Sequence, residues 1–114
     1  YMSKYMQIDI RLIPFYERRF KNQFPNIAHL LTQMSYAELV EKEASLYEMA
    51  DVLETIAENP DTPSDIRDAV SPYAERIMGL KEVARDHLLA RRLNDLDQEL
   101  YRMEDLFEDL ERAL

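Results

Sequence analysis

Residues 89–114 read LARRLNDLDQELYRMEDLFEDLERAL, and this stretch says most about the fold. Apolar side chains recur along it at alternating steps of four and three residues without a break. They are Leu89, Leu93, Leu96, Leu100, Met103, Phe107, Leu110 and Leu114, and we name them the seam. A heptad sustained over this length is typical of a helix that packs along one stripe against other helices. The sequence therefore predicts an all-α protein with a long C-terminal coiled-coil-like helix.

This long helix is predicted to begin near Ser71-Pro72, because proline is favoured in the first turn of a helix. No proline follows, so the sequence predicts one helix over 72–112, roughly 60 Å long at about 1.5 Å per residue. Apolar residues between Ile77 and Ala84 follow a different phase from the seam, which implies a change of neighbour. Part of the helix is then expected to overhang the bundle. Its seam needs a second protomer, a client protein, or a fold-back after a turn near Asn94-Asp95.

A second helix is predicted over 36–58. Ser35-Tyr36-Ala37-Glu38 has the form of a capping box, in which the serine hydroxyl accepts from the backbone N–H of the glutamate. An apolar stripe at helical spacing follows, and Asn59-Pro60 ends it because the residue before a proline is pushed out of the α region. Aromatic residues spaced four apart predict a helix over 15–33, and Thr62-Pro63 predicts the start of a short one over 63–70.

Residues 6–12 alternate apolar and polar side chains, which is the period of a half-buried strand. In a chain that otherwise reads as helical, this segment is an extended arm, a strand added to a partner, or a helix with a misleading pattern. We predict one helical domain over 1–114, folded as an antiparallel bundle. It comprises an arm over 1–14, a helical part over 15–58, and a helical part over 63–114 that carries the seam.

The composition excludes several kinds of chemistry. The chain has no cysteine, which excludes disulfides, thiol catalysis and cysteine-ligated zinc. It has one glycine, so phosphate-cradling loops, dinucleotide fingerprints and hairpin turns that need a positive φ are expected to be nearly excluded. No apolar run approaches the roughly 20 residues of a membrane span, and no signal peptide opens the chain. We therefore expect a cytoplasmic protein without membrane insertion.

The charge is distributed unevenly along the chain. The net charge is −9, composed of +3 over residues 1–34 and −12 over residues 35–114. An acidic body repels nucleic-acid phosphates, since binding there depends on releasing counterions to Lys and Arg. We therefore expect no nucleic-acid partner and interpret the charge as a solvated acidic surface. An acidic mimic of nucleic acid is a remote alternative.

The two histidines carry no recognisable site. Neither His29 nor His87 has a carboxylate three or four residues away, so the Glu-x-x-His pair of di-iron helical bundles is absent. We interpret both as surface or partly buried side chains. No cofactor is predicted.

Residues 48–53, Glu-Met-Ala-Asp-Val-Leu, resemble the second metal-binding motif of MazG-type nucleotide pyrophosphohydrolases. That resemblance implies a magnesium site, since magnesium favours carboxylate oxygens. The family also uses a Glu-x-x-Glu on a facing helix, and here Glu38 and Glu41 have that spacing but lie on the same predicted helix. Because one helix would present all four carboxylates in a line, we expect no metal bound by Glu38, Glu41, Glu48 and Asp51 together, and no enzymatic activity.

Residues 35–100 resemble flagellar type III export chaperones of the FliT type. The similarity rests on Tyr36-x-x-Leu39-x-x-x-Glu43 in the predicted central helix and on Leu88, Leu89, Arg92 and Leu96 in the next. The resemblance implies a small all-helical cytoplasmic chaperone or adaptor of the type III secretion system of the flagellum. Such a protein holds a client through apolar helix faces.

The sequence thus predicts a non-enzymatic protein-binding module. Its partner is a client protein, a second copy of the chain, or both. The predicted partner-binding residues are Leu89, Leu93, Leu96, Leu100, Met103, Phe107 and Leu110. A homodimeric coiled-coil structural or regulatory subunit is the main alternative, because self-association satisfies the seam equally well.

Overall fold

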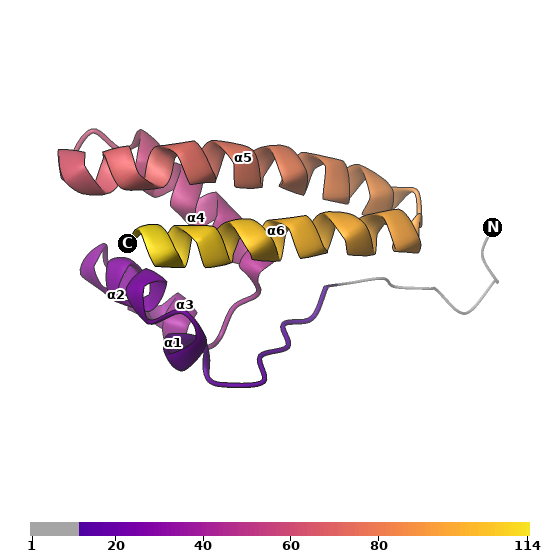
Figure 1. The fold of residues 1–114 in the computed structure, drawn as a ribbon, viewed down its shortest axis with the longest axis horizontal. Helices are drawn as coiled ribbons and strands as arrows, with labels where there is room; N and C mark the ends of the chain where they lie inside the picture. The colour runs from indigo at the N-terminus through magenta and orange to yellow at the C-terminus, as the bar shows by residue number, and fades with distance from the viewer. Residues whose placement is uncertain (1–11) are drawn as a thin grey trace, which may run out of the picture.

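The computed structural model describes residues 12–114, which form six α-helices and no strand (Figure 1). In chain order they are α1 (Phe20–Gln23), α2 (Pro25–Gln33), α3 (Ala37–Glu41), α4 (Leu46–Glu58), α5 (Ser64–Leu89) and α6 (Leu93–Ala113). The prediction of an all-α fold is confirmed. The strand-like pattern over 6–12 lies outside the described residues except for Leu12, which belongs to no helix. None of the described helices is long and apolar enough to cross a membrane.

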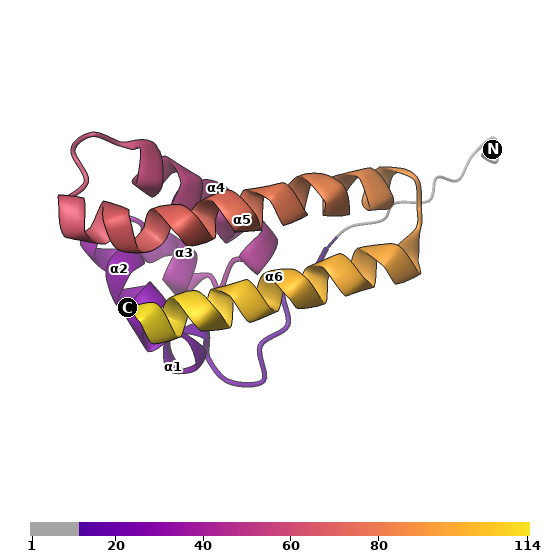
Figure 2. The same ribbon diagram turned by 45° about the horizontal axis from the view of Figure 1, so that its top comes forward.

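Two long antiparallel helices, α5 and α6, run side by side along the long axis of the molecule (Figures 1 and 2). Helix α4 packs on α5 and more lightly on α6, and α1 to α3 gather near the C-terminal end of α6. The end of the α5–α6 pair nearest its turn extends past α4 in both views. The described chain measures 52 × 25 × 23 Å.

The single helix predicted over 72–112 is wrong. The chain reverses at Ala90–Arg92, so the seam folds back on the chain's own α5. Of the three ways of covering the seam considered above, the chain uses the fold-back. Its turn lies slightly earlier than the predicted position near Asn94-Asp95. The predicted helix start at Pro72 and the separate helix over 63–70 are also wrong, because α5 runs continuously from Ser64 with Pro72 inside it.

Three helices end in the same way, each with a residue other than glycine in the left-handed region. These residues are Ser35 (φ 73°), Glu43 (φ 50°) and Arg91 (φ 58°). Each donates its N–H to the carbonyl three residues earlier, and the next residue donates to the carbonyl five residues before it. This pattern is the Schellman motif, where glycine is the usual residue. At these three helix ends the left-handed conformation is therefore reached without glycine.

The capping box at Ser35 is not formed, because Ser35 ends α2 instead of starting a helix. A second turn around Glu43 divides the predicted helix over 36–58 into α3 and α4. The working N-cap lies ten residues later. There the Ser45 hydroxyl accepts from the Glu48 N–H at 3.1 Å and starts α4.

The predicted helix over 15–33 is likewise shorter than expected. Residues 12–19 are not helical, and Phe24 separates α1 from α2. Carboxylates distant in sequence satisfy the free N–H groups at both helix starts. Glu43 accepts from the Phe20 N–H at 3.0 Å, and Glu111 accepts from the N–H groups of Asn26 and Ile27, each at 2.9 Å. Such acceptors stabilise a helix N-terminus electrostatically as well.

An aromatic row joins the N-terminal helices to α6. The ring centroids are 5.5 Å apart for Tyr16 and Phe20, 5.4 Å for Phe20 and Phe24, and 6.4 Å for Phe24 and Phe107. Phe20 and Phe107 are fully buried and belong to one core cluster with residues of α2, α4 and α5. Phe24 belongs to the same cluster, and the partly buried Tyr16 packs against it.

Candidate functional site

The seam is divided between core and surface. Four of its members are buried: Leu96 is 4% exposed, Met103 1%, and Phe107 and Leu110 0%. Leu100 is half-buried. Leu89 and Leu93, beside the α5–α6 turn, are 68% and 54% exposed. Four of the predicted partner-binding residues are therefore core, whereas Leu89, Leu93 and Leu100 reach the surface. Leu114, the last member of the seam, is 38% exposed.

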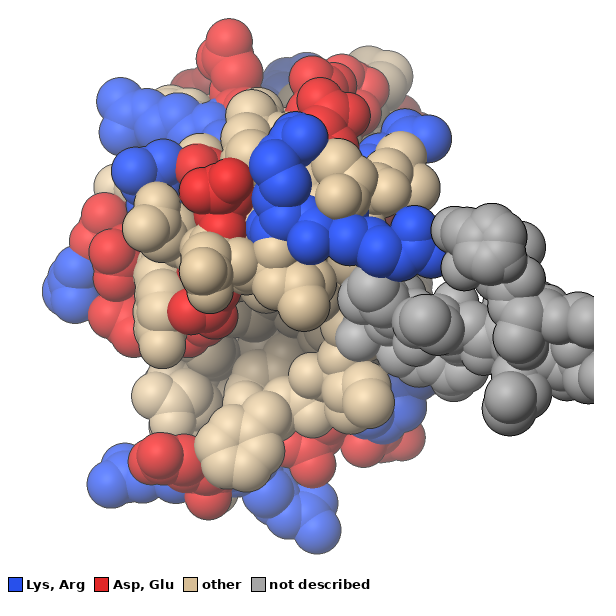
Figure 3. Space-filling view, turned by 90° about the vertical axis from the view of Figure 1, so that its right-hand side faces the viewer, with Lys and Arg blue, Asp and Glu red and all other residues tan. Residues whose placement is uncertain are grey.

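An apolar groove of about 410 Å³ opens beside Leu100 and Met103 in the middle of the seam. One wall is the non-helical segment 12–17, and the opposite wall is α6. The start of α4 and the end of α1 close the groove between these walls. The space-filling view shows the molecule hollowed, with uncharged side chains around the hollow (Figure 3). Its apolar lining includes Leu12, Ile13, Phe15, Phe24, Leu46, Leu100 and Met103.

The wall formed by residues 12–17 holds two strongly exposed apolar side chains. Ile13 is 76% exposed and Phe15 is 83% exposed, more than any other large apolar side chain among the described residues. They flank Pro14, which supplies no backbone N–H. Large apolar side chains left in water beside a groove are typical of a surface that binds another molecule.

Tyr16 anchors this wall to the body of the protein. Its hydroxyl donates to the Ala44 carbonyl at 2.6 Å, and its ring packs edge-on against Phe20. Burial and the nearby Glu43 carboxylate raise the pKa of Tyr16, so the hydroxyl keeps the proton that it donates. Tyr16 therefore ties the wall to the body of the protein through a hydrogen bond and an aromatic contact.

Carboxylates line both rims of the groove. Glu17 follows the apolar wall, and Glu104 and Glu108 stand on α6 opposite it. None of the three forms an ion pair within residues 12–114. Partial burial, together with the neighbouring Glu108, Asp105 and Asp97, raises the pKa of Glu104. The groove thus combines an apolar lining with three carboxylates that pair with no cation among residues 12–114.

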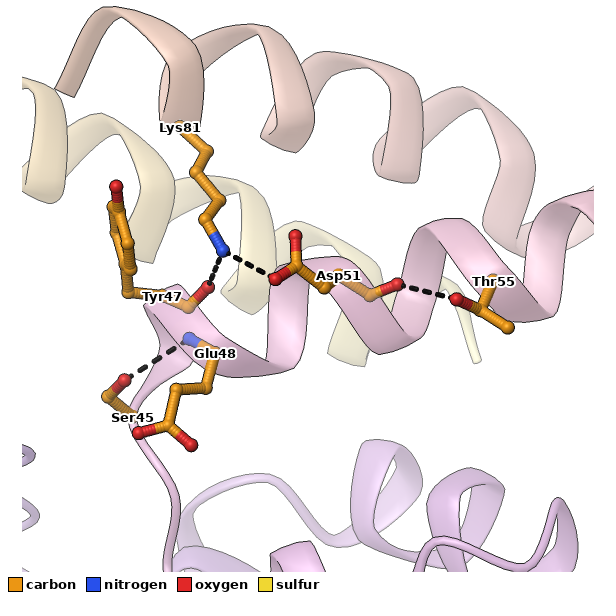
Figure 4. Close-up of polar contacts among 6 residues, drawn as sticks. All are labelled: Ser45, Tyr47, Glu48, Asp51, Thr55 and Lys81. Carbon is orange, nitrogen blue, oxygen red and sulfur yellow. Dashed lines mark hydrogen bonds and ion pairs between the residues drawn. The ribbon is translucent and has the colours of Figure 1, made fainter. Parts of the chain in front are cut away.

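Lys81 of α5 fixes the start of α4, which closes the groove (Figure 4). Its ammonium group donates to the Tyr47 carbonyl and to the Asp51 carboxylate, each at 2.8 Å, and lies 4.3 Å from the centre of the Tyr47 ring. Burial raises the pKa of Tyr47, an effect partly offset by Arg85. This cluster positions Tyr47 and the preceding Leu46 in the groove lining.

The carboxylates of the MazG-like motif do not share one helix, because the turn at Glu43 places Glu38 and Glu41 on α3 and Glu48 and Asp51 on α4. The argument that one helix presents all four in a line is therefore wrong. Asp51 pairs with Lys81. Across residues 12–114, no three histidine or carboxylate side chains are grouped so that they could hold a metal ion.

The histidines have ordinary surroundings. His29 is exposed on α2. His87 is half-buried, and its Nδ1 accepts from the Arg92 Nε–H at 3.0 Å across the α5–α6 turn. The backbone joins the same two residues, because the Arg92 N–H donates to the His87 carbonyl in the Schellman motif.

The wall over 12–17 is not predicted from the sequence, because Leu12 falls in the strand-like run over 6–12 and residues 15–17 fall in the predicted helix over 15–33. The available signal was the pair of apolar residues around Pro14, in a place where the chain cannot continue a helix. No protein-family model matches the chain, and no curated protein or solved structure matches it either.

Proposed function

We propose that this chain is a non-enzymatic protein-binding module that holds a partner protein in the apolar groove, as a small helical export chaperone holds its client. The observation that carries the proposal is the exposure of Ile13 and Phe15, 76% and 83%, on the wall of that groove. Burying an apolar side chain of this size contributes about 1.5–3 kcal/mol, so a partner that covers both gains substantially.

The groove also gives the predicted seam a limited role in binding. Leu100 and Met103 line the groove, whereas Leu96, Phe107 and Leu110 are committed to the core. The proposed contact surface is therefore the groove side of α6 with residues 12–17. The resemblance of residues 35–100 to FliT-type chaperones agrees with this function.

The test compares three proteins of full length. One is the unchanged chain, one carries Ile13→Asp and Phe15→Asp, and one carries Val83→Asp, which changes a 42% exposed apolar residue of α5 outside the groove. Each is immobilised and incubated with lysate of the source organism. A retained protein is then purified and its dissociation constant measured with each variant.

We expect a partner that binds the unchanged chain and the Val83 variant alike and binds the groove variant at least tenfold more weakly. Because the replaced side chains are exposed, all three proteins should show the same helical circular dichroism. Equal affinity for all three proteins would contradict the proposal.

A homodimeric structural subunit is the second candidate, favoured by the exposed Leu89 and Leu93 at the α5–α6 turn. Sedimentation equilibrium tests it directly. A dimer that becomes a monomer on Leu89→Asp and Leu93→Asp would support this candidate. A monomer over the micromolar range would exclude it.

A further inference from the structure

We infer that the partner segment received by the groove is basic as well as apolar, presenting one or two large apolar side chains flanked by lysine or arginine. This inference rests on the proposed function and adds the chemical character of the partner. Its basis is the position of Glu17 on one rim of the groove and of Glu104 and Glu108 on the other.

These rim carboxylates differ from many others on the molecule. Asp51 pairs with Lys81, Glu99 with Arg102, and Asp109 with Arg112. Glu43 and Glu111 accept from backbone N–H groups at helix starts. Within residues 12–114 the rim carboxylates have no cation at ion-pair distance.

The spacing along α6 makes the rim charge unfavourable in the free protein. Glu104 and Glu108 are four residues apart, so their carboxylates are neighbours on the helix surface, where like charges destabilise. Asp105 adds a further negative charge beside them. A cation between the rims relieves this repulsion, and an anionic segment increases it.

Charge complementarity then acts together with apolar burial. The apolar lining supplies affinity for any apolar anchor, whereas the rims select among anchors by the charge of the flanking residues. The negative potential also accelerates the encounter with a basic segment and weakens as salt increases.

The experiment uses the full chain and three fluorescent synthetic peptides of fourteen residues. All three carry leucine and phenylalanine at the same places, and the remaining positions are lysine in the first, glutamine in the second and glutamate in the third. Fluorescence anisotropy gives the dissociation constant of each at low and at high salt.

We expect the lysine peptide to bind at least tenfold more tightly than the glutamate peptide, with the glutamine peptide between them. Glu104→Gln with Glu108→Gln should weaken binding of the lysine peptide between about twofold and about thirtyfold and leave the glutamine peptide unchanged, since two exposed ion pairs are lost with the first peptide and none with the second. Glu75→Gln, an exposed carboxylate of α5 outside the groove, is the matched control and should change neither.

The outcomes separate this inference from the function on which it rests. If all three peptides bind equally and Phe15→Asp abolishes this binding, the inference of a basic partner is wrong and the groove remains the proposed binding surface. Failure of every peptide to bind, or binding unaffected by Phe15→Asp, would overturn both. A dimer of the chain that is weakened by Phe15→Asp would also overturn the inference, because a second copy would then occupy the groove.

Discussion

Tyr16 is the residue on which the groove wall depends most. Tyr16→Phe removes the hydroxyl that donates to the Ala44 carbonyl and leaves the ring in place. We expect the free energy of unfolding to fall by about 0.5–1.5 kcal/mol, measured by urea denaturation. Tyr101→Phe is the control, because Tyr101 is 61% exposed, and it should change stability very little. Equal stability of the two variants would show that the hydrogen bond does not hold the wall.

The contribution of Glu104 to the stability of the protein should depend on pH. Burial and the neighbouring carboxylates raise its pKa in the folded protein, so the folded state binds the proton more readily than the unfolded state. Ionised Glu104 therefore costs stability at neutral pH, and the cost disappears as pH falls through the raised pKa and below its ordinary value of 4.5.

Glu104→Gln removes this charge at every pH. We expect the variant to be more stable than the unchanged chain at pH 7 and equally stable below about pH 4, where the carboxyl is protonated in both states. Thermal unfolding across this range measures the difference. A variant that is less stable at pH 7 would mean that a cation already pairs with Glu104.

At the scale of elements, the helix ends were the hardest feature to predict. Apolar spacing identifies a helix because it reflects which face is buried, and it located the helical regions well. The ends at Ser35, Glu43 and Arg91 carry none of the usual glycine signal. Two helix starts are capped by Glu43 and Glu111 from elsewhere in the chain, and such contacts exist only after folding. The groove could not be predicted for the same reason, since four separate segments line it.

Two substitutions that involve glycine test the interior of α5 and the turn at its end. Gly79 lies inside α5, and a Cβ there would meet nothing within 4 Å, so Gly79→Ala should raise the free energy of unfolding by about 0.5–1 kcal/mol. Arg91→Gly should also stabilise, because it removes the cost of about 1 kcal/mol of holding a side chain at a φ of 58°. Urea denaturation of both variants checks this, and a destabilising Arg91→Gly would contradict the Schellman turn.

The two ends of the seam should respond differently to the same truncation. Leu96 is 4% exposed, so Leu96→Ala should cost about 2–5 kcal/mol of stability. Leu93 is 54% exposed three residues earlier, and Leu93→Ala should change stability by less than about 0.5 kcal/mol. Differential scanning calorimetry compares them. Equal costs would indicate that the turn at Ala90–Arg92 is not where the chain folds back.

For the whole molecule, the core-facing side of α6 and the groove are two different surfaces, although the heptad pattern shows a single seam. The seam folds back as core, and residues 12–17 together with α6 form the groove that we propose as the binding surface. The hydrophobic pattern predicted that helices pack along α6, because burial follows spacing. It did not distinguish an intramolecular neighbour from a partner, since both bury the same side chains.

Mapping the bound surface by NMR tests this account most directly, and a chain of 13.6 kDa suits the method. The lysine-flanked peptide is titrated into the ¹⁵N-labelled full-length protein, and the amide shift changes are followed residue by residue. We expect the changes to concentrate at residues 12–17, 45–47 and 100–108, which include the groove lining. Changes centred on residues 88–93 at the α5–α6 turn, or no changes at all, would contradict it.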